Sequence, residues 1–243
     1  MKKIVIGDIH GRFAELKELL QKASFDYDND QLISLGDIVD RGPEPYNCIF
    51  ELMKIKNLIA ITGNHDFYLN RWILNNNKYH DLGTSHGVGI TLLKWLELSD
   101  EEKEKVKNFL KFQVPYYVDK DNKLFVHGGI YRNEKLEEQT LSDFCENRFF
   151  FEEVLSMQSN KIEKVPTVED FIEIFIGHTP TLCYKYQKGK YRKSNNMIDI
   201  VTSPINIHNV WNMDTGAGFL EGKLSLMNIN TKDLFQVDIK KEF

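Results

Sequence analysis

The sequence has few cysteines, no long apolar run and no excess of basic residues. Its three cysteines, Cys48, Cys145 and Cys183, are too few and too scattered for a disulfide scaffold or a CxxC zinc site. No apolar run reaches the roughly 18 residues of a membrane-spanning helix, and the stretch Ile4–Gly7 is too short for a signal-peptide core. A formal net charge of −5 argues against a basic surface for nucleic acid. We therefore expect a cytoplasmic protein that binds neither membranes nor nucleic acid.

Internal repeats, low-complexity segments and Pro/Gly-rich linkers are also missing, so we expect a single domain over residues 1–243. Hydrophobic residues make up 42% of the chain, which is enough for a sizeable core. In the first half, short apolar runs alternate with helical patterns, which is typical of βαβ crossovers and a mostly parallel sheet. The expected strands are Ile4–Ile6, Leu32–Leu35 and Leu58–Ile61, and the expected helices cover 13–23, 46–55 and 67–74.

The second half mixes helical segments with short strands. Residues 67–113 look mostly helical, and Ser99 followed by Glu102 forms a capping box at the start of a helix over Asp100–Lys111. One further helix is expected to carry Phe144, Phe151, Val154 and Leu155. The other expected strands are Leu124–His127, Ile174–Ile176, Val210–Met213, Lys223–Ile229 and Leu234–Ile239. This order predicts an α/β fold in which two mixed β-sheets pack together and are flanked by helices.

Polar, glycine-containing turns follow five of the expected strands. Their sequences are Gly7-Asp8-Ile9-His10-Gly11, Gly36-Asp37-Ile38-Val39-Asp40-Arg41-Gly42, Gly63-Asn64-His65-Asp66, His127-Gly128-Gly129 and Gly177-His178-Thr179-Pro180. Parallel sheets place their sites at the carboxyl ends of strands, so Asp, Asn and His donors converge there. Such donors can hold two divalent cations that share one carboxylate, a recurrent arrangement for hydrolysing phosphate esters. A single Gly-Asp usually serves a turn, but turns do not require histidine at positions 10, 65, 127 and 178.

Together these motifs resemble the metallophosphoesterase superfamily, and GDIVDRG is similar to its phosphoprotein-phosphatase-like branch. That branch contains Ser/Thr and Tyr protein phosphatases and the symmetrical diadenosine tetraphosphatases. The resemblance runs from Gly7 to about Leu226 and ends with Asp214-Thr215-Gly216-Ala217 and Gly222-Lys223-Leu224, similar to small bacterial and phage-type phosphatases. It implies a calcineurin-like metallophosphoesterase sandwich.

The resemblance also implies a dinuclear site. Asp8, His10 and a bridging Asp37 would bind the first metal, and Asp37, Asn64, His127 and His178 would bind the second. The mixed oxygen and nitrogen donors suit Mn²⁺, with Fe or Zn²⁺ as alternatives. A hydroxide between the two ions would attack phosphorus directly.

Four further residues would serve the reaction itself. His65 would protonate the leaving group, Asp40 would orient His65, and Arg41 would bind the phosphoryl oxygens. The family uses a second arginine, for which we select Arg148, with Arg132 as the competitor. For either arginine, a solvent-exposed place on a helix is an equally open interpretation.

The substrate stays open at this level. We expect phosphomonoesters, foremost phospho-Ser/Thr of proteins with phospho-Tyr as an extension; the alternatives are a diadenosine tetraphosphate hydrolase and a catalytically silent phosphate-binding or partner-binding relative. Asp66 stands where most protein phosphatases of this branch have Glu and tetraphosphatases often have Asp. Tetraphosphatases, however, usually have Ala in place of Asp40, so the two signals oppose each other.

His80, His86 and His208 lie outside the motifs and are expected to be ordinary surface or core histidines. The oligomeric state is not predicted.

Overall fold

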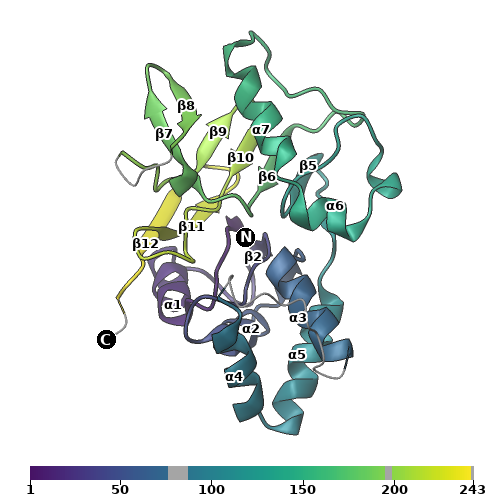
Figure 1. The fold of residues 1–243 in the computed structure, drawn as a ribbon, viewed down its shortest axis with the longest axis vertical. Helices are drawn as coiled ribbons and strands as arrows, with labels where there is room; N and C mark the ends of the chain where they lie inside the picture. The colour runs from purple at the N-terminus through teal and green to yellow at the C-terminus, as the bar shows by residue number, and fades with distance from the viewer. Residues whose placement is uncertain (76–86, 195–198, 242–243) are drawn as a thin grey trace.

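The computed structural model describes residues 1–75, 87–194 and 199–241 (Figure 1). His80 and His86 lie outside the described residues. His208 lies in the turn between two strands, where its Nε2 is 3.0 Å from the carbonyl oxygen of Met157. None of the helices in the described part of the chain combines the length and the apolar character of a membrane span.

The first sheet has five strands in the order β12-β11-β1-β2-β3. Its strands β1, β2 and β3 are parallel, β11 pairs antiparallel with β1, and β12 pairs antiparallel with β11. The bounds are β1 Lys3–Ile6, β2 Gln31–Ser34, β3 Asn57–Ala60, β11 Lys223–Asn228 and β12 Leu234–Asp238. Helices α1 (Phe13–Lys22) and α2 (Pro45–Leu52) connect the parallel strands, so the βαβ alternation expected from the sequence is confirmed.

The second sheet has five strands in the order β4-β5-β6-β10-β9. Its central strands β5, β6 and β10 are parallel, and the edge strands pair antiparallel to their neighbours. The bounds are β4 Tyr116–Val118, β5 Lys123–Val126, β6 Glu173–Ile176, β9 Ile205–Ile207 and β10 Val210–Asn212, beside a hairpin of β7 (Tyr184–Gln187) and β8 (Lys190–Lys193). The sequence analysis missed β4, β7, β8 and β9 because they are short and lack the continuous apolar runs of buried strands.

A buried apolar layer joins the two sheets. Phe125 of β5 and Phe175 of β6 stack with ring centroids 4.9 Å apart. The cluster consists of Val5, Ile33, Leu35, Ile61, Phe125, Phe175, Met213, Met227 and Ile229. Because side chains from both sheets form this layer, the sheets pack face to face, and the predicted fold class of two packed sheets flanked by helices is confirmed.

Helices cover the outer faces of both sheets (Figure 1). Buried apolar residues of helices α1 to α5 share one cluster with those of the first sheet, and residues of α6 and α7 share another with the second sheet. The remaining bounds are α3 Asn64–Leu74, α4 Gly89–Glu97, α5 Asp100–Phe112, α6 Leu141–Glu146 and α7 Phe149–Ser156. The predicted capping box is confirmed, because Oγ of Ser99 accepts from the Glu102 amide, and the Ser99 amide donates to Oε2 of Glu102 at 2.8 Å.

The expectation of one helix carrying both Phe144 and Leu155 is wrong. The chain forms two helices, α6 and α7, and is extended at Asn147 between them (φ −72°, ψ 99°). Oδ1 of Asn147 accepts a hydrogen bond from the Phe150 amide at 3.0 Å. An Asn side chain that satisfies a free amide of the first turn favours a helix start, so the chain begins a new helix there. The break places Arg148 at the start of α7.

Candidate metal centre

Asp37 lies at the centre of the candidate site, in the turn after β2. Its Oδ1 lies 3.4 Å from Nε2 of His127, and its Oδ2 lies 3.8 Å from Nε2 of His10 and 3.9 Å from Nε2 of His65. Two groups of buried side chains in the described structure could hold a metal ion, namely His10 with Asp37 and His65, and Asp37 with His127 and His178. Both groups share Asp37, the residue for which the family resemblance implies a bridging role.

His10 and His127 are held by the same kind of contact. Nδ1 of His10 lies 3.0 Å from the Val39 carbonyl oxygen, and Nδ1 of His127 lies 2.7 Å from that of Leu35. A ring nitrogen that donates to a carbonyl leaves the other nitrogen of a neutral imidazole as an acceptor. Burial, with the nearby charge of Arg41, holds the pKa of His10 well below its ordinary value. His10 therefore presents a neutral ring whose Nε2 is suited to a cation.

Asn64 and His178 complete the second group. Oδ1 of Asn64 lies 2.8 Å from Nδ1 of His178 and 3.1 Å from Nε2 of His127. Ligands of a cation bound at about 2.1 Å are about 3.0–3.4 Å apart, so these atoms and Oδ1 of Asp37 have suitable spacing. Nε2 of His178 is buried without a hydrogen-bond partner, and burial with the neighbouring His127 holds the pKa of His178 well below its ordinary value.

Asp8 brings a second carboxylate to the centre. Its Oδ2 lies 4.0 Å from Nε2 of His10, and both of its oxygens accept from the His178 amide at 3.2 Å. Burial, then the charges of Asp214 and Asp37, raise the pKa of Asp8 well above its ordinary value. Asp214 is a buried carboxylate to which the sequence analysis gave no role in the site. Carboxylates buried together need positive charge, so the donors fit a divalent cation.

His65 and Asp40 form a buried pair beside Asp37. Nδ1 of His65 lies 2.6 Å from Oδ2 of Asp40. Burial alone would lower the pKa of His65, but the charge of Asp37 and the hydrogen bond to Asp40 outweigh it, so the pKa is raised. Distance alone would also allow Nε2 of His65 to bind a metal. A ring with a raised pKa, held by a carboxylate, is better suited to carrying a proton.

The structure distinguishes the arginine candidates. Nη2 of Arg41 lies 3.3 Å from Nε2 of His65, which places its guanidinium at the centre. Nη1 of Arg148 donates to the His178 carbonyl oxygen at 3.1 Å and to Oγ1 of Thr179 at 3.3 Å. Arg132 instead pairs with Glu153 at 3.0 Å and donates to the Pro166 carbonyl. Of the two arginines considered from the sequence, Arg148 adjoins a candidate ligand.

Several of these residues have an unusual backbone conformation. Left-handed φ values occur at His10 (50°), Asp37 (49°), Asp40 (69°), Arg41 (67°) and His178 (69°). Such a conformation costs a non-glycine residue about 1–3 kcal/mol and is concentrated at functional sites. The turns are also tightly packed, because a Cβ atom at Gly63 would lie 2.1 Å from the Asp37 amide nitrogen. The strand ends are therefore bent sharply where the candidate ligands meet.

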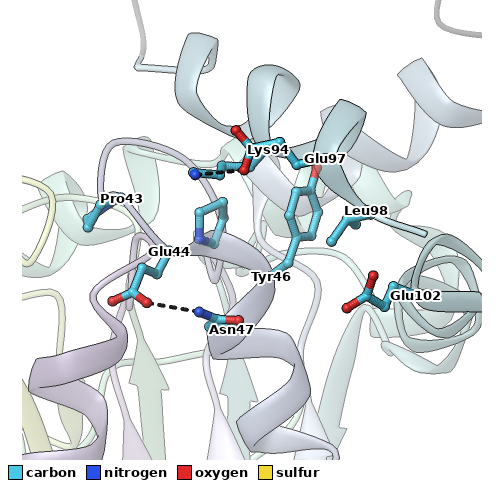
Figure 2. Close-up of a pocket in the computed structure, with 9 residues that line it drawn as sticks. Pro43, Glu44, Tyr46, Asn47, Lys94, Glu97, Leu98 and Glu102 are labelled. Atoms are coloured by element: carbon cyan, nitrogen blue, oxygen red, sulfur yellow. Dashed lines mark hydrogen bonds and ion pairs between the residues drawn. The ribbon is translucent and has the colours of Figure 1, made fainter.

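A cavity of about 250 Å³ near the start of α2 is a separate feature (Figure 2). It is lined by residues of the loop after Arg41, of α2, and of the α4–α5 region. Its polar groups already have partners, since Glu44 accepts from Asn47 at 2.8 Å and Lys94 pairs with Glu97 at 2.7 Å. None of the candidate metal ligands lines it, so this cavity is not the centre described above.

The chain is similar over part of its length to known phosphohydrolases. The chain is 32% identical over 146 residues to an asymmetrical bis(5'-nucleosyl)-tetraphosphatase of Oceanobacillus iheyensis, covering 54% of this chain and 57% of that relative. It is 34% identical over 137 residues to a symmetrical bis(5'-nucleosyl)-tetraphosphatase of Hamiltonella defensa, covering 54% of this chain and 45% of that relative. A shorter match, with 42% identity over 62 residues, is to serine/threonine-protein phosphatase 1 of Salmonella typhimurium and covers 26% of this chain and 28% of that relative. The chain thus spans about half the length of the first two relatives.

The fold has a solved counterpart. A crystal structure described as that of a candidate diadenosine tetraphosphatase aligns with a TM-score of 0.63 at 18% identity, covering 99% of this chain and 95% of that one. At that identity the likeness establishes the fold. The model of the calcineurin-like phosphoesterase family matches residues 1–208. With most of its length matched and its candidate ligands gathered at the strand ends, the chain belongs to the calcineurin-like phosphoesterase family.

Proposed function

We propose that this protein is a metal-dependent hydrolase of phosphoric esters and anhydrides whose substrates are bis(5'-nucleosyl) tetraphosphates. The observation that carries the chemistry is the pair of buried ligand groups sharing Asp37 beside the His65–Asp40 pair. The observation that favours the substrate is that two curated relatives matching about half of this chain are bis(5'-nucleosyl)-tetraphosphatases.

Two divalent cations would be held by the ligands proposed from the sequence. Asp8, His10 and Asp37 would hold the first, and Asp37, Asn64, His127 and His178 the second. Bound there, the cations would supply an activated water and offset the charge of the phosphoryl oxygens. We propose Mn²⁺ as the metal, since the mixed carboxylate, amide and imidazole donors suit it, with Fe or Zn²⁺ as alternatives.

The residues around the centre would divide the remaining work. Arg41 and Arg148 would bind phosphoryl oxygens, because a guanidinium offers several donors in one plane. Once Arg41 donates to the phosphoryl oxygens rather than to Nε2 of His65, His65 would hold a proton at Nε2 for the departing oxygen, with Nδ1 donating to Asp40. Asp40 would keep the ring oriented and stabilise its charge, which agrees with the raised pKa of His65.

Hydrolysis of phospho-Ser/Thr is the second candidate. A serine alkoxide is a poor leaving group and needs a proton, whereas a nucleotide leaves as a phosphate that needs less help. The buried His65–Asp40 pair is therefore most valuable for a phosphomonoester of an alcohol. The match to the Salmonella typhimurium protein phosphatase supports this candidate over a short part of the chain.

A steady-state comparison tests both candidates. The purified chain with added Mn²⁺ would be assayed on diadenosine tetraphosphate, a phosphoserine peptide and p-nitrophenyl phosphate. We expect the highest kcat/KM on diadenosine tetraphosphate. Chromatography of the products would show whether cleavage is symmetrical, giving two ADP, or asymmetrical, giving ATP and AMP. A higher kcat/KM on the phosphopeptide would favour the second candidate, and equally slow turnover of all three would contradict both.

A further inference from the structure

The turn that joins the two sheets lies against the side chain of Arg41. It follows β10 of the second sheet and leads into β11 of the first. Cζ of Arg41 lies 5.0 Å from the centre of the Phe219 ring. A Cβ atom at Gly218 would lie 2.4 Å from Cδ and 2.6 Å from Nη1 of Arg41, so the backbone of the turn approaches the arginine closely. The turn thus forms one side of the space that Arg41 occupies.

The guanidinium of Arg41 also contacts the candidate metal centre. Nη2 of Arg41 lies 3.3 Å from Nε2 of His65. The Arg41 amide also donates to the Gly87 carbonyl oxygen at 3.0 Å. Arg41 is therefore held at its backbone, and its guanidinium contacts both the Phe219 ring and Nε2 of His65.

Phe219 is held in place by hydrogen bonds within the turn. The Phe219 amide donates to the Gly216 carbonyl at 2.9 Å, and the Gly216 amide donates to Oδ1 of Asp214 at 2.9 Å. Nε of the buried Arg12 donates to the Ala217 carbonyl at 3.2 Å. The Phe219 side chain remains 41% exposed, so its ring contributes less to the core than to the surface beside Arg41.

We propose that Phe219 is a positioning residue that holds the Arg41 guanidinium in the orientation that binds a phosphoryl group. An arginine side chain has many rotamers, and a ring that attracts the guanidinium face removes most of the unproductive ones. Because less freedom is lost on binding, the fork of Arg41 binds phosphate more tightly. This inference rests on the proposed function, since it assumes that a phosphoryl group binds at Arg41.

Binding of inorganic phosphate to the Mn²⁺-loaded protein tests the inference without any turnover. Phe219→Leu keeps an apolar side chain but removes the ring. By isothermal titration calorimetry we expect it to weaken phosphate binding roughly 3- to 30-fold, the range for a cation–π contact. Phe219→Tyr retains the ring and should bind phosphate as the wild type does. Leu220→Ala, at an exposed neighbour in the same turn, is the matched control and should also be unchanged.

A double-mutant cycle separates positioning from a general structural effect. In an Arg41→Ala background, Phe219→Leu should cause no further loss of phosphate affinity, because its effect passes through Arg41. Metal content and melting temperature of each variant should match the wild type. Additive losses, or an unchanged affinity in Phe219→Leu alone, would overturn the inference. So would a variant that binds phosphate normally yet has a raised KM for diadenosine tetraphosphate alone, since the ring would then contact a nucleobase.

The result can be told apart from a failure of the proposed function. A wild-type protein that binds Mn²⁺ and phosphate but hydrolyses no phosphoester would contradict the function, while the cycle would still decide the role of Phe219. A wild-type protein that binds Mn²⁺ but no phosphate would contradict both.

Discussion

Nδ1 of His65 lies 2.6 Å from Oδ2 of Asp40, and the two side chains are almost completely buried. A carboxylate in this position fixes the ring so that Nε2 faces the candidate metal centre. Nε2 lies 3.9 Å from Oδ2 of Asp37. This arrangement provides a proton donor beside the metal ligands, and its contribution can be measured separately from metal binding.

Replacing His65 tests the proton donor. We expect His65→Asn to retain both metals and to slow turnover of a phosphoserine peptide by roughly 10²–10⁴-fold, as for other general acids. The loss should be much smaller for p-nitrophenyl phosphate, whose leaving group needs little protonation. Asp40→Asn should follow the same trend more mildly. His208→Asn, a histidine outside the centre, serves as the control. Equal slowing of both leaving groups with metals still bound would exclude the general-acid role.

Metal removal should abolish activity and lower stability. In the metal-free protein, the buried carboxylates of Asp8 and Asp37 repel each other, so the folded state loses stability without a cation. Mn²⁺ at about 100 times its dissociation constant should restore activity and add about 2.7 kcal/mol to the free energy of unfolding. Differential scanning calorimetry with and without chelator measures this gain, and Asp37→Asn should lose most of it. Full activity in protein shown by elemental analysis to be metal-free would disprove the mechanism.

The stabilisation by metal should grow with pH. Burial raises the pKa of Asp8 and, with the charge of Asp37, raises the pKa of Asp66 to about 6. A carboxyl group whose pKa is raised by folding makes its full contribution to the stability of the metal-free protein when the pH is below the unfolded-state pKa of about 4. That contribution is lost as the pH rises through the folded-state value, about 6 for Asp66. The pKa of Asp37 is lowered, despite its burial, by His127 and His65, so its own contribution is lost only in stronger acid.

Ionisation of Asp8 and Asp66 should therefore lower the melting temperature of the metal-free protein between about pH 4 and pH 6.5. His10 and His178, whose pKa values are lowered well below normal, act in the opposite direction over this range. The gain on adding Mn²⁺ should increase over the same range, because protons compete with the metal for Asp8. Melting curves at several pH values, with chelator or with Mn²⁺, provide the measurement. The melting temperature of the wild type should drop relative to that of Asp66→Asn, which cannot ionise, as the pH rises through this range. A gain from Mn²⁺ that shrinks as the pH rises would contradict the assignment of Asp8 as a ligand.

Arg148 and Arg132 make a matched pair for mutation. Arg148→Ala should raise KM and weaken phosphate binding by roughly 10- to 100-fold, the value of a charge-assisted hydrogen bond. Arg132→Ala removes an ion pair with Glu153 on the surface and should change either constant by less than about twofold. Steady-state kinetics and phosphate inhibition measure both. The opposite ranking of the two variants would transfer the phosphate-binding role to Arg132.

An ion pair remote from the centre should matter for stability alone. Nζ of Lys3 lies 2.7 Å from Oδ2 of Asp119. Burial alone would raise the pKa of Asp119, but the hydrogen bond from Lys3 outweighs burial, so the pKa is lowered. Asp119→Asn should lower the free energy of unfolding by about 3 kcal/mol, the lower end for a broken buried pair, since Asp121 remains 3.6 Å from Lys3. Urea denaturation measures this loss, and Asp121→Asn is the exposed control. Unchanged stability of Asp119→Asn would show that the pair is well solvated.

The sequence by itself determined the strand ends and their chemistry. Short, mostly apolar segments such as Ile4–Ile6 and Leu32–Leu35 form strands that are buried on both faces, and the Asp, Asn and His turns directly follow them. Because parallel strands of one sheet end at one edge, the meeting of the turns after β1, β2 and β3 could be anticipated from local pattern. His127 and His178 follow strands of the second sheet, so their place at Asp37 was implied by the family resemblance and depends on how the two sheets pack. Local pattern also gave the helix start at Ser99, since capping is a contact between near neighbours in the chain.

The tertiary structure alone decided what depends on contacts distant in sequence. The break at Asn147 places Arg148 beside His178, whereas Arg132 has the same side chain and lies in an equally plausible stretch of sequence. The buried position of Asp214 and the contact of Phe219 with Arg41 arise because one turn passes from the second sheet to the first. Local propensity carries no information about such a crossing, because it is set by how the two sheets pack through Phe125 and Phe175.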